Sequence, residues 1–168
     1  MIADSIIQYL HRNHVPFVRR PHLRAITAQA LAQSLHVSGF QVAKSVILHM
    51  RDRLWICVAS APDTLDLERV AQTVGTRRVR LAAEVEFAGL FPECEVGAEP
   101  PFGQLYGLPV MVDEHLARAG RLLFRAGSHQ EAIELRFEDF LALEAPLLGA
   151  IVRSRPGELT YAPMDQHA

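Results

Sequence analysis

The stretch Val42-Ala-Lys-Ser-Val-Ile-Leu-His-Met50 is followed by Arg51-Asp-Arg53 and then by Leu54-Trp-Ile-Cys-Val-Ala-Ser-Ala61. Both long runs are rich in apolar and β-branched residues, which is typical of strands. The three polar residues between them make a short connection, so we expect the two strands to form an antiparallel hairpin. Pro62 ends the second strand because proline has no backbone N–H to donate.

Before this hairpin, the sequence predicts two helices and a short strand. Apolar residues at helical spacing predict an amphipathic helix over residues 2–14. Residues 15–18 are predicted as an edge strand because Pro16 interrupts them. Thr27 is a favourable N-cap residue and predicts a second helix, which ends before Gly39.

After the hairpin, helices and strands are interspersed. We expect a helix over residues 65–74, with Asp63 or Thr64 near its cap. Residues 96–109 are dense in glycine and proline and predict an ordered, stiff loop. The remaining predicted elements are strands over 79–81, 110–112, 121–125 and 133–136 and helices over 83–90 and 137–143, the last with a continuation after Pro146 left open.

The order of these elements predicts the fold class. Several strand pairs are antiparallel and no strict βαβ alternation runs through the chain. We therefore expect an α+β fold: one compact domain over residues 1–153, with a mixed, largely antiparallel or barrel-like sheet flanked by helices. Residues 154–168 are polar and contain proline, and they are predicted to form a C-terminal tail.

Composition excludes several classes of protein. Of the 168 residues, 49% are hydrophobic and 21% charged, which is typical of a soluble globular domain and not of a disordered or coiled-coil chain. No apolar run approaches the roughly 20 residues of a membrane span, so we expect a cytoplasmic protein without a membrane partner. Cys57 and Cys94 lack the spacing of a disulfide framework or a zinc site and are predicted to be buried small hydrophobic residues.

Charge is distributed unevenly, although the net charge is only −2. Residues 1–80 carry a balance of +6 and residues 81–168 a balance of −8. The basic half suits the phosphate contacts that position a nucleic acid, and the alternative is a solvated surface on which opposite charges intermingle. Two clusters are candidates for phosphate contacts: Arg77, Arg78 and Arg80, and alternatively Arg12, Arg19, Arg20 and Arg24.

Lysine occurs only once, as Lys44, whereas the other sixteen basic residues are arginines. Lysine is a compact ammonium that can lose its proton when buried, whereas arginine is a broad planar cation that stays charged. Lys44 stands in an apolar stretch where desolvation lowers the pKa of an amine. This setting indicates a functional lysine, and the alternative is the chance survival of one lysine at a strand edge.

Motifs for several kinds of chemistry are absent from the sequence: the P-loop, the dinucleotide-binding fingerprint, HExxH and GxSxG. Three elements remain: Lys44, the loop over residues 97–103, and the turn Ala126-Gly127-Ser128-His129. Glycines allow backbone N–H groups to approach a ligand, and histidine can donate, accept or titrate near neutral pH. The alternatives are a structural corner for the loop and a surface residue for His129.

These elements together resemble the aminoacyl-tRNA editing family, which comprises YbaK-type free-standing deacylases and the insertion domain of bacterial prolyl-tRNA synthetases. The resemblance rests on Ala-Lys-Ser-Val-Ile-Leu around Lys44, on Glu95-Val-Gly-Ala-Glu-Pro-Pro-Phe-Gly103, and on Phe124-Arg-Ala-Gly-Ser-His129. It covers roughly residues 2–145 and includes the segment 22–29. It implies a mixed-sheet domain that hydrolyses the ester between a wrong amino acid and the 3′ end of a tRNA, without a metal.

Carried over residue by residue, the resemblance implies that Lys44 is the essential lysine and that Gly97 and Pro101 form the GxxxP loop. Ser45 departs from the family pattern, because relatives similar to alanine-specific editors tend to have asparagine after the lysine, so the amino acid removed stays open. The predicted catalytic residues are Lys44, Gly97 and His129; the predicted substrate-binding residues are Thr27, Ser45, Pro101, Gly127 and Ser128; and the predicted tRNA-binding residues are Arg77, Arg78 and Arg80.

Ester hydrolysis requires a positioned water molecule, stabilisation of the oxyanion and placement of the ribose and phosphate. Lys44 suits the last two, and backbone N–H groups near Gly97 and Gly127 suit the oxyanion. We expect water attack without cofactor, metal or covalent intermediate. The expected partners are mischarged tRNA and, transiently, an aminoacyl-tRNA synthetase, while the oligomeric state stays open. The alternatives are a non-catalytic tRNA-binding module and a Schiff-base lysine enzyme.

Overall fold

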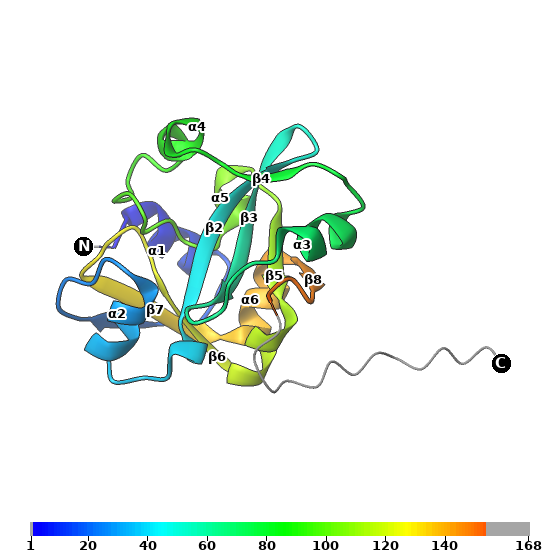
Figure 1. Cartoon of the computed structure of the whole chain (residues 1–168). Coiled ribbons are helices and arrows are strands. Elements are labelled where there is room, and N and C mark those ends of the chain that lie inside the picture. The colour runs from blue at the N-terminus through cyan, green and yellow to red at the C-terminus, as the bar shows by residue number, and fades with distance from the viewer. Residues whose placement is uncertain (1, 154–168) are drawn as a thin grey trace.

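The predicted hairpin is the centre of the fold in the computed structural model, which describes residues 2–153 (Figure 1). Strand β2 (Ala43–Met50) pairs antiparallel with β3 (Arg53–Ser60), so that Lys44 lies opposite Ala59. Arg51 and Asp52 form the turn with φ angles of 52° and 57°. Positive φ at both turn residues gives the backbone twist that a two-residue hairpin needs. The hairpin prediction is confirmed.

The strands divide between two sheets. The five-stranded sheet has the order β4-β2-β3-β5-β8: β4 (Val79–Leu81) is antiparallel to β2, whereas β5 (Val110–Asp113) and β8 (Leu147–Gly149) run parallel to β3 and β5 respectively. The other sheet is antiparallel, with the order β1 (Val18–Pro21), β7 (Glu131–Arg136) and β6 (Arg121–Arg125). The expected α+β class with a mixed sheet is confirmed, although the division into two sheets was not predicted.

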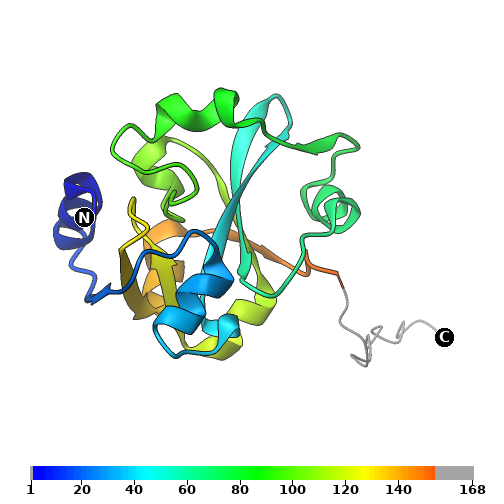
Figure 2. The ribbon, with the colours of Figure 1, turned by 60° about the vertical axis from the view of Figure 1, so that its left-hand side comes forward.

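Helices cover the sheets (Figure 2). Helix α2 lies against the start of β2 and the three-stranded sheet, whereas α3 packs against the hairpin. The helical elements are α1 (Asp4–Arg12), α2 (Ala28–Ser34), η1 (Gly39–Gln41), α3 (Leu67–Val74), α4 (Glu84–Phe87), η2 (Ala88–Leu90), α5 (Gly103–Tyr106), η3 (Glu114–Ala119) and α6 (Phe137–Glu144). No helix within residues 2–153 is long and apolar enough to cross a membrane.

The core consists of three groups of buried side chains, and their arrangement fixes the position of Lys44. Successive residues of a strand point to opposite faces, so Ala43 and Ile47 enter the main core while Val42 and Val46 lie on the other face. Val42 packs under α2 and Val46 packs near α3. Lys44 therefore points outward between these two apolar groups.

The structure corrects two local predictions, the start of the first strand and the cap of α3, and it decides the course of the chain after Pro146. Strand β1 begins at Val18, three residues later than predicted, because its partners are Glu131–Glu134 of β7. Residues 147–149 form β8 and not a continued helix, because Ala145 has a φ of 43° and Pro146 follows it.

Helix α3 begins at Leu67, and its N-cap is Asp66 rather than Asp63 or Thr64. The loop over residues 96–109 also contains the short helix α5. The predicted tail, residues 154–168, lies outside the described residues.

Candidate active site

The ammonium of Lys44 is held by the loop that follows β3. Lys44 Nζ donates to the backbone oxygen of Ala61 at 3.2 Å and to that of Asp63. An ammonium has three N–H groups, so one remains for another acceptor. Burial lowers the pKa of Lys44, and the charge of Asp63 opposes that change.

Asp63 is itself fixed in this loop. Its side chain is buried, and its Oδ2 accepts from the hydroxyl of Ser60 at 2.7 Å. Its backbone N–H donates to the oxygen of Ser60 at 3.0 Å, which closes a tight turn. The carboxylate of Asp63 therefore has a defined orientation, while its backbone oxygen binds Lys44.

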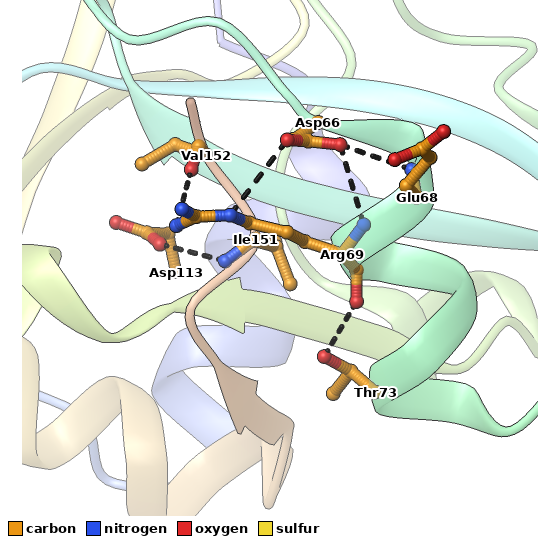
Figure 3. A network of polar contacts seen from close by, with 7 residues as sticks. All are labelled: Asp66, Glu68, Arg69, Thr73, Asp113, Ile151 and Val152. Atoms are coloured by element: carbon orange, nitrogen blue, oxygen red, sulfur yellow. Dashed lines mark hydrogen bonds and ion pairs between the residues drawn. The ribbon is translucent and has the colours of Figure 1, made fainter. Parts of the chain in front are cut away.

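A strap formed by residues 151–153 is hydrogen-bonded to the continuation of this loop, residues 64–66 (Figure 3). The N–H of Asp66 donates to Ile151 and that of Arg153 donates to Thr64, both at 2.8 Å. The strap is anchored by the buried Asp113, whose Oδ1 accepts from the N–H of Ile151, and by Arg69, which donates to the oxygen of Val152. The loop that binds Lys44 is thus tied to both α3 and the end of β5.

The turn that contains His129 forms the second part of the site. His129 is buried, and its Nε2 lies 2.8 Å from the oxygen of Val96. Because a carbonyl oxygen only accepts, Nε2 carries the proton of this hydrogen bond. The Nδ1 of His129 is also buried and has no hydrogen-bond partner among residues 2–153.

Glu95 connects this turn to its surroundings. Its Oε2 accepts from the N–H of His129 at 2.6 Å, and its Oε1 accepts from Arg24 at 3.2 Å. The backbone bond from His129 lowers the pKa of Glu95 most strongly, with further help from Arg24. The N–H of Glu95 donates to the oxygen of Gly127, whose φ is 86°. Segment 22–29, the Gly97 loop and the His129 turn are therefore joined at one carboxylate.

Gly97 lies beside His129 with a φ of 83°, and a Cβ added to it would lie 3.6 Å from Cε1 of that ring. Its N–H donates to the carboxylate of Glu99 at 3.1 Å, and its oxygen accepts from Arg125 at 3.2 Å. The N–H of Gly127 donates to Ala98 at 2.8 Å. Both glycine N–H groups that the sequence suggested for an oxyanion are thus engaged within the protein.

Two connections join the Lys44 and His129 parts. Val42 pairs with Leu123 in a parallel bridge, so β2 and β6 run side by side, one towards Lys44 and the other towards the His129 turn. The N–H of Ala25 donates to the oxygen of His129, and Ala25 shares one apolar group with Ala61. The predicted catalytic elements, which are far apart in the sequence, are therefore carried by segments that the Val42–Leu123 bridge and Ala25 join.

The predicted substrate-binding residues Thr27, Ser45, Pro101 and Ser128 lie on different elements, and two of their hydroxyl groups are already hydrogen-bonded within the protein. The hydroxyl of Thr27 accepts from Ala30 and caps α2, as expected of an N-cap. Ser45 lies on the face of β2 opposite to that of Lys44. Pro101 is buried beside the core residue Phe102. The hydroxyl of Ser128 accepts from the N–H of Gln130.

The predicted tRNA-binding arginines lie at the other end of the hairpin. A groove of about 730 Å³ is lined by His49, Arg51, Asp52, Thr76, Arg77, Arg78, Val79 and Arg80. Arg80 forms two 2.7 Å bonds with Glu86, whereas Arg77 and Arg78 have no ion pair within residues 2–153. At ~3.3 Å per strand residue, the groove lies about 20 Å from Lys44. The hairpin thus has its lysine at one end and a basic groove at the other, where β4 pairs with β2.

The four arginines predicted as the alternative patch, unlike Arg77 and Arg78, mostly form ion pairs. Arg19 and Arg20 are paired with Glu131 and Glu134 across β1 and β7, and Arg24 is paired with Glu95. Arg12 lies at the end of α1. The charge of this patch is therefore largely balanced by neighbouring glutamates.

Three residues of the site had no functional role assigned from the sequence: Asp63, Glu95 and Arg125. Glu95 and Arg125 lie within the stretches that carry the family resemblance, and their positions beside the two glycine motifs were the available signal. Asp63 was interpreted as a helix cap. Among residues 2–153, no group of three His, Cys, Asp or Glu side chains is arranged to hold a metal ion.

A family model, the aminoacyl-tRNA editing domain, matches residues 22–143. The chain belongs to this family. The matched segment includes Lys44, the Gly97 loop and the His129 turn, so the resemblance inferred from these motifs is confirmed. No curated protein matches the sequence.

Solved structures share the fold of this editing domain. One, provisionally described as a trans-editing enzyme for prolyl tRNA synthetase, is 22% identical with a TM-score of 0.78, and the match covers 92% of this chain and 100% of the other. The hypothetical protein APE2540 is 16% identical with a TM-score of 0.81, over 89% and 100% of the two chains. A protein from Marinobacter aquaeolei VT8, provisionally assigned to signal transduction, is 19% identical with a TM-score of 0.71, over 92% of this chain and 31% of its own.

Proposed function

We propose that this protein is a free-standing, trans-acting editing enzyme that hydrolyses the ester of a mischarged tRNA. The observation that carries the proposal is that Lys44, the Gly97 loop and the His129 turn, all within the segment that matches the editing family, stand on segments joined by the Val42–Leu123 bridge and by hydrogen bonds. The comparison with the provisionally described trans-editing structure agrees with it.

Lys44 acts as a fixed positive charge. Two backbone oxygens orient its ammonium, and the third N–H is directed to the substrate. A charge that is already oriented stabilises an oxyanion or a ribose-linked phosphate without reorganisation during the reaction. The same two carbonyl acceptors, with the carboxylate of Asp63, favour an ammonium over the neutral amine that Schiff-base chemistry requires.

His129 contributes a hydrogen-bond acceptor. Since Nε2–H is bound to Val96, Nδ1 is the ring atom left to accept from the attacking water or from a substrate N–H or O–H group, and because it is buried a neighbouring group must first move to expose it. Gly97 borders this ring so closely that its lack of a side chain keeps the approach open. For the N–H of Gly97 to bind the oxyanion, the carboxylate of Glu99 must first leave it.

We propose water as the nucleophile, with no metal and no covalent intermediate. An aminoacyl ester is already reactive, so orientation and charge stabilisation supply the acceleration required. The basic groove at Arg77, Arg78 and Arg80 binds the phosphates of the tRNA stem, and the substrate's ester end reaches the Lys44 site. The protein works in the cytoplasm and contacts an aminoacyl-tRNA synthetase transiently.

A panel of mischarged tRNAs, incubated with the purified protein, tests the proposal. We expect release of free amino acid from at least one mischarged tRNA and none by Lys44→Ala. The uneven charge of the chain also favours a second candidate, a tRNA-binding module. Salt-sensitive tRNA binding without release of amino acid from any member of the panel would replace the enzyme by that module.

A further inference from the structure

We infer that Asp63, oriented by Ser60, is a positioning residue that holds the Lys44 side chain in place as a cation. The catalytic part of this inference rests on the proposed function. The structural part concerns only how one buried carboxylate and one half-buried ammonium are arranged. Asp63 was predicted only as a cap of the following helix, a role that Asp66 takes instead.

Asp63 is linked to Lys44 by one hydrogen bond and by the charge of its side chain. Its backbone oxygen accepts directly from Lys44 Nζ, and its carboxylate acts on the ammonium as an opposite charge. The carboxylate is 3% exposed, so water screens its charge weakly. A buried carboxylate is costly unless it has hydrogen bonds and a nearby cation, and Ser60 and Lys44 supply these.

The charge balance at Lys44 explains why this carboxylate is needed. Burial between the apolar groups of Val42 and Val46 favours the neutral amine and lowers the Lys44 pKa. Among residues 2–153, Asp63 is the group whose charge raises the Lys44 pKa against this effect. Removing that charge leaves desolvation unopposed, so a larger fraction of Lys44 is neutral at a given pH.

The support behind the loop makes this arrangement rigid. The turn from Ser60 to Asp63 continues into Thr64 and Asp66, which are both bonded to the strap at residues 151–153. Asp113 and Arg69 anchor the strap on either side (Figure 3). The position of Asp63 relative to Lys44 is therefore set by the fold and not by a mobile surface loop.

Because Lys44 is the sole lysine of the chain, its titration can be followed without assignment. Protein labelled with ¹³Cε-lysine gives one lysine signal, whose chemical shift against pH reports the Lys44 pKa directly. We compare the wild type with Asp63→Asn and with Asp66→Asn. Asp66→Asn is the matched control, since it removes one carboxylate three residues away in the same loop and asparagine still caps α3.

We expect the Lys44 pKa to fall in Asp63→Asn and to remain at the wild-type value in Asp66→Asn. On a mischarged tRNA that the wild type hydrolyses, the alkaline limb of kcat in Asp63→Asn moves to lower pH by the same amount, while KM stays within about twofold. An unchanged Lys44 pKa in a folded Asp63→Asn protein would overturn the inference.

Should Asp63→Asn fail to fold, Ser60→Ala takes its place. This variant keeps the carboxylate but removes the hydroxyl that orients it, and we expect a smaller fall in the Lys44 pKa. No fall in this variant refutes the role of Ser60 and Asp63. The titration needs no tRNA, so it decides the inference even if no mischarged tRNA is hydrolysed and the proposed function fails.

Discussion

Replacing Arg77 and Arg78 by glutamine should weaken the salt dependence of tRNA binding by an amount that the structure allows us to calculate. Each phosphate contact releases counterions and steepens the plot of log affinity against log salt by about 0.9. Arg77 and Arg78 line the basic groove without an ion pair among residues 2–153, so each is available for one phosphate. The slope should therefore decrease by about 1.8.

Arg80 should contribute less than either of them. Its guanidinium is already bonded to Glu86 by two contacts, so a phosphate must compete with a carboxylate. Arg80→Gln alone should change the slope by well under about 0.9. The suitable control is the pair Arg19→Gln and Arg20→Gln, which removes the same charge from side chains that Glu131 and Glu134 already neutralise.

The assay is equilibrium binding of a labelled tRNA at several salt concentrations between 50 and 200 mM. Over this roughly fourfold range, a slope difference of about 1.8 means that wild-type affinity falls about twelvefold more than that of the variant. The rate of hydrolysis at saturating tRNA should remain unchanged, because these contacts position the substrate about 20 Å from Lys44. Equal slopes for the wild type and for Arg77→Gln/Arg78→Gln would show that the groove is a solvated face.

Three further predictions concern the site and the core. Lys44→Ala and Lys44→Arg should each lower single-turnover hydrolysis by about 100-fold or more while the protein still folds, and wild-type turnover by Lys44→Arg would remove the special role of lysine. Gly97→Val should block the approach to His129 and also lower Tm, since valine is strained at a φ of 83°; unchanged turnover in the folded variant would exclude the loop from the mechanism. Burial raises the pKa of Glu144, so the folded state holds its proton more tightly than the unfolded state and stability falls as pH rises above the unfolded pKa. Glu144→Gln should therefore gain unfolding free energy relative to the wild type between pH 4 and pH 7 in denaturant titrations, and a difference independent of pH would contradict this.

The sequence correctly predicted the helices and strands that are determined by neighbouring residues. The hairpin follows from two apolar runs and a short polar connection, and the end of α3 follows from Gly75, which adopts a φ of 76°. Strand β1 has no such signal, because its residues are largely exposed and its position depends on pairing with Glu131–Glu134 of β7. Strand β8 likewise exists because β5 offers a free edge after Pro146.

In the site, too, local signals identify some residues, whereas others depend on contacts between distant parts of the chain. Lys44 could be selected from composition alone, since it is one lysine among seventeen basic residues. Its partner Asp63 could not, because Asp63 and Asp66 both fit an N-cap pattern and only the three-dimensional structure shows that Asp66 caps α3 while the backbone oxygen of Asp63 binds Lys44. The role of Glu95 depends on Arg24 and His129, which are distant in the sequence.

The strap at residues 151–153 has a consequence for biosynthesis. These residues follow Lys44 by more than a hundred positions, yet they hold the loop that orients its ammonium. A nascent chain that has already formed the hairpin therefore still lacks the support of its lysine until the strap has emerged from the ribosome. Since β8, next to the strap, pairs parallel with β5, the final sheet strand and the lysine support are expected to form together, late in synthesis.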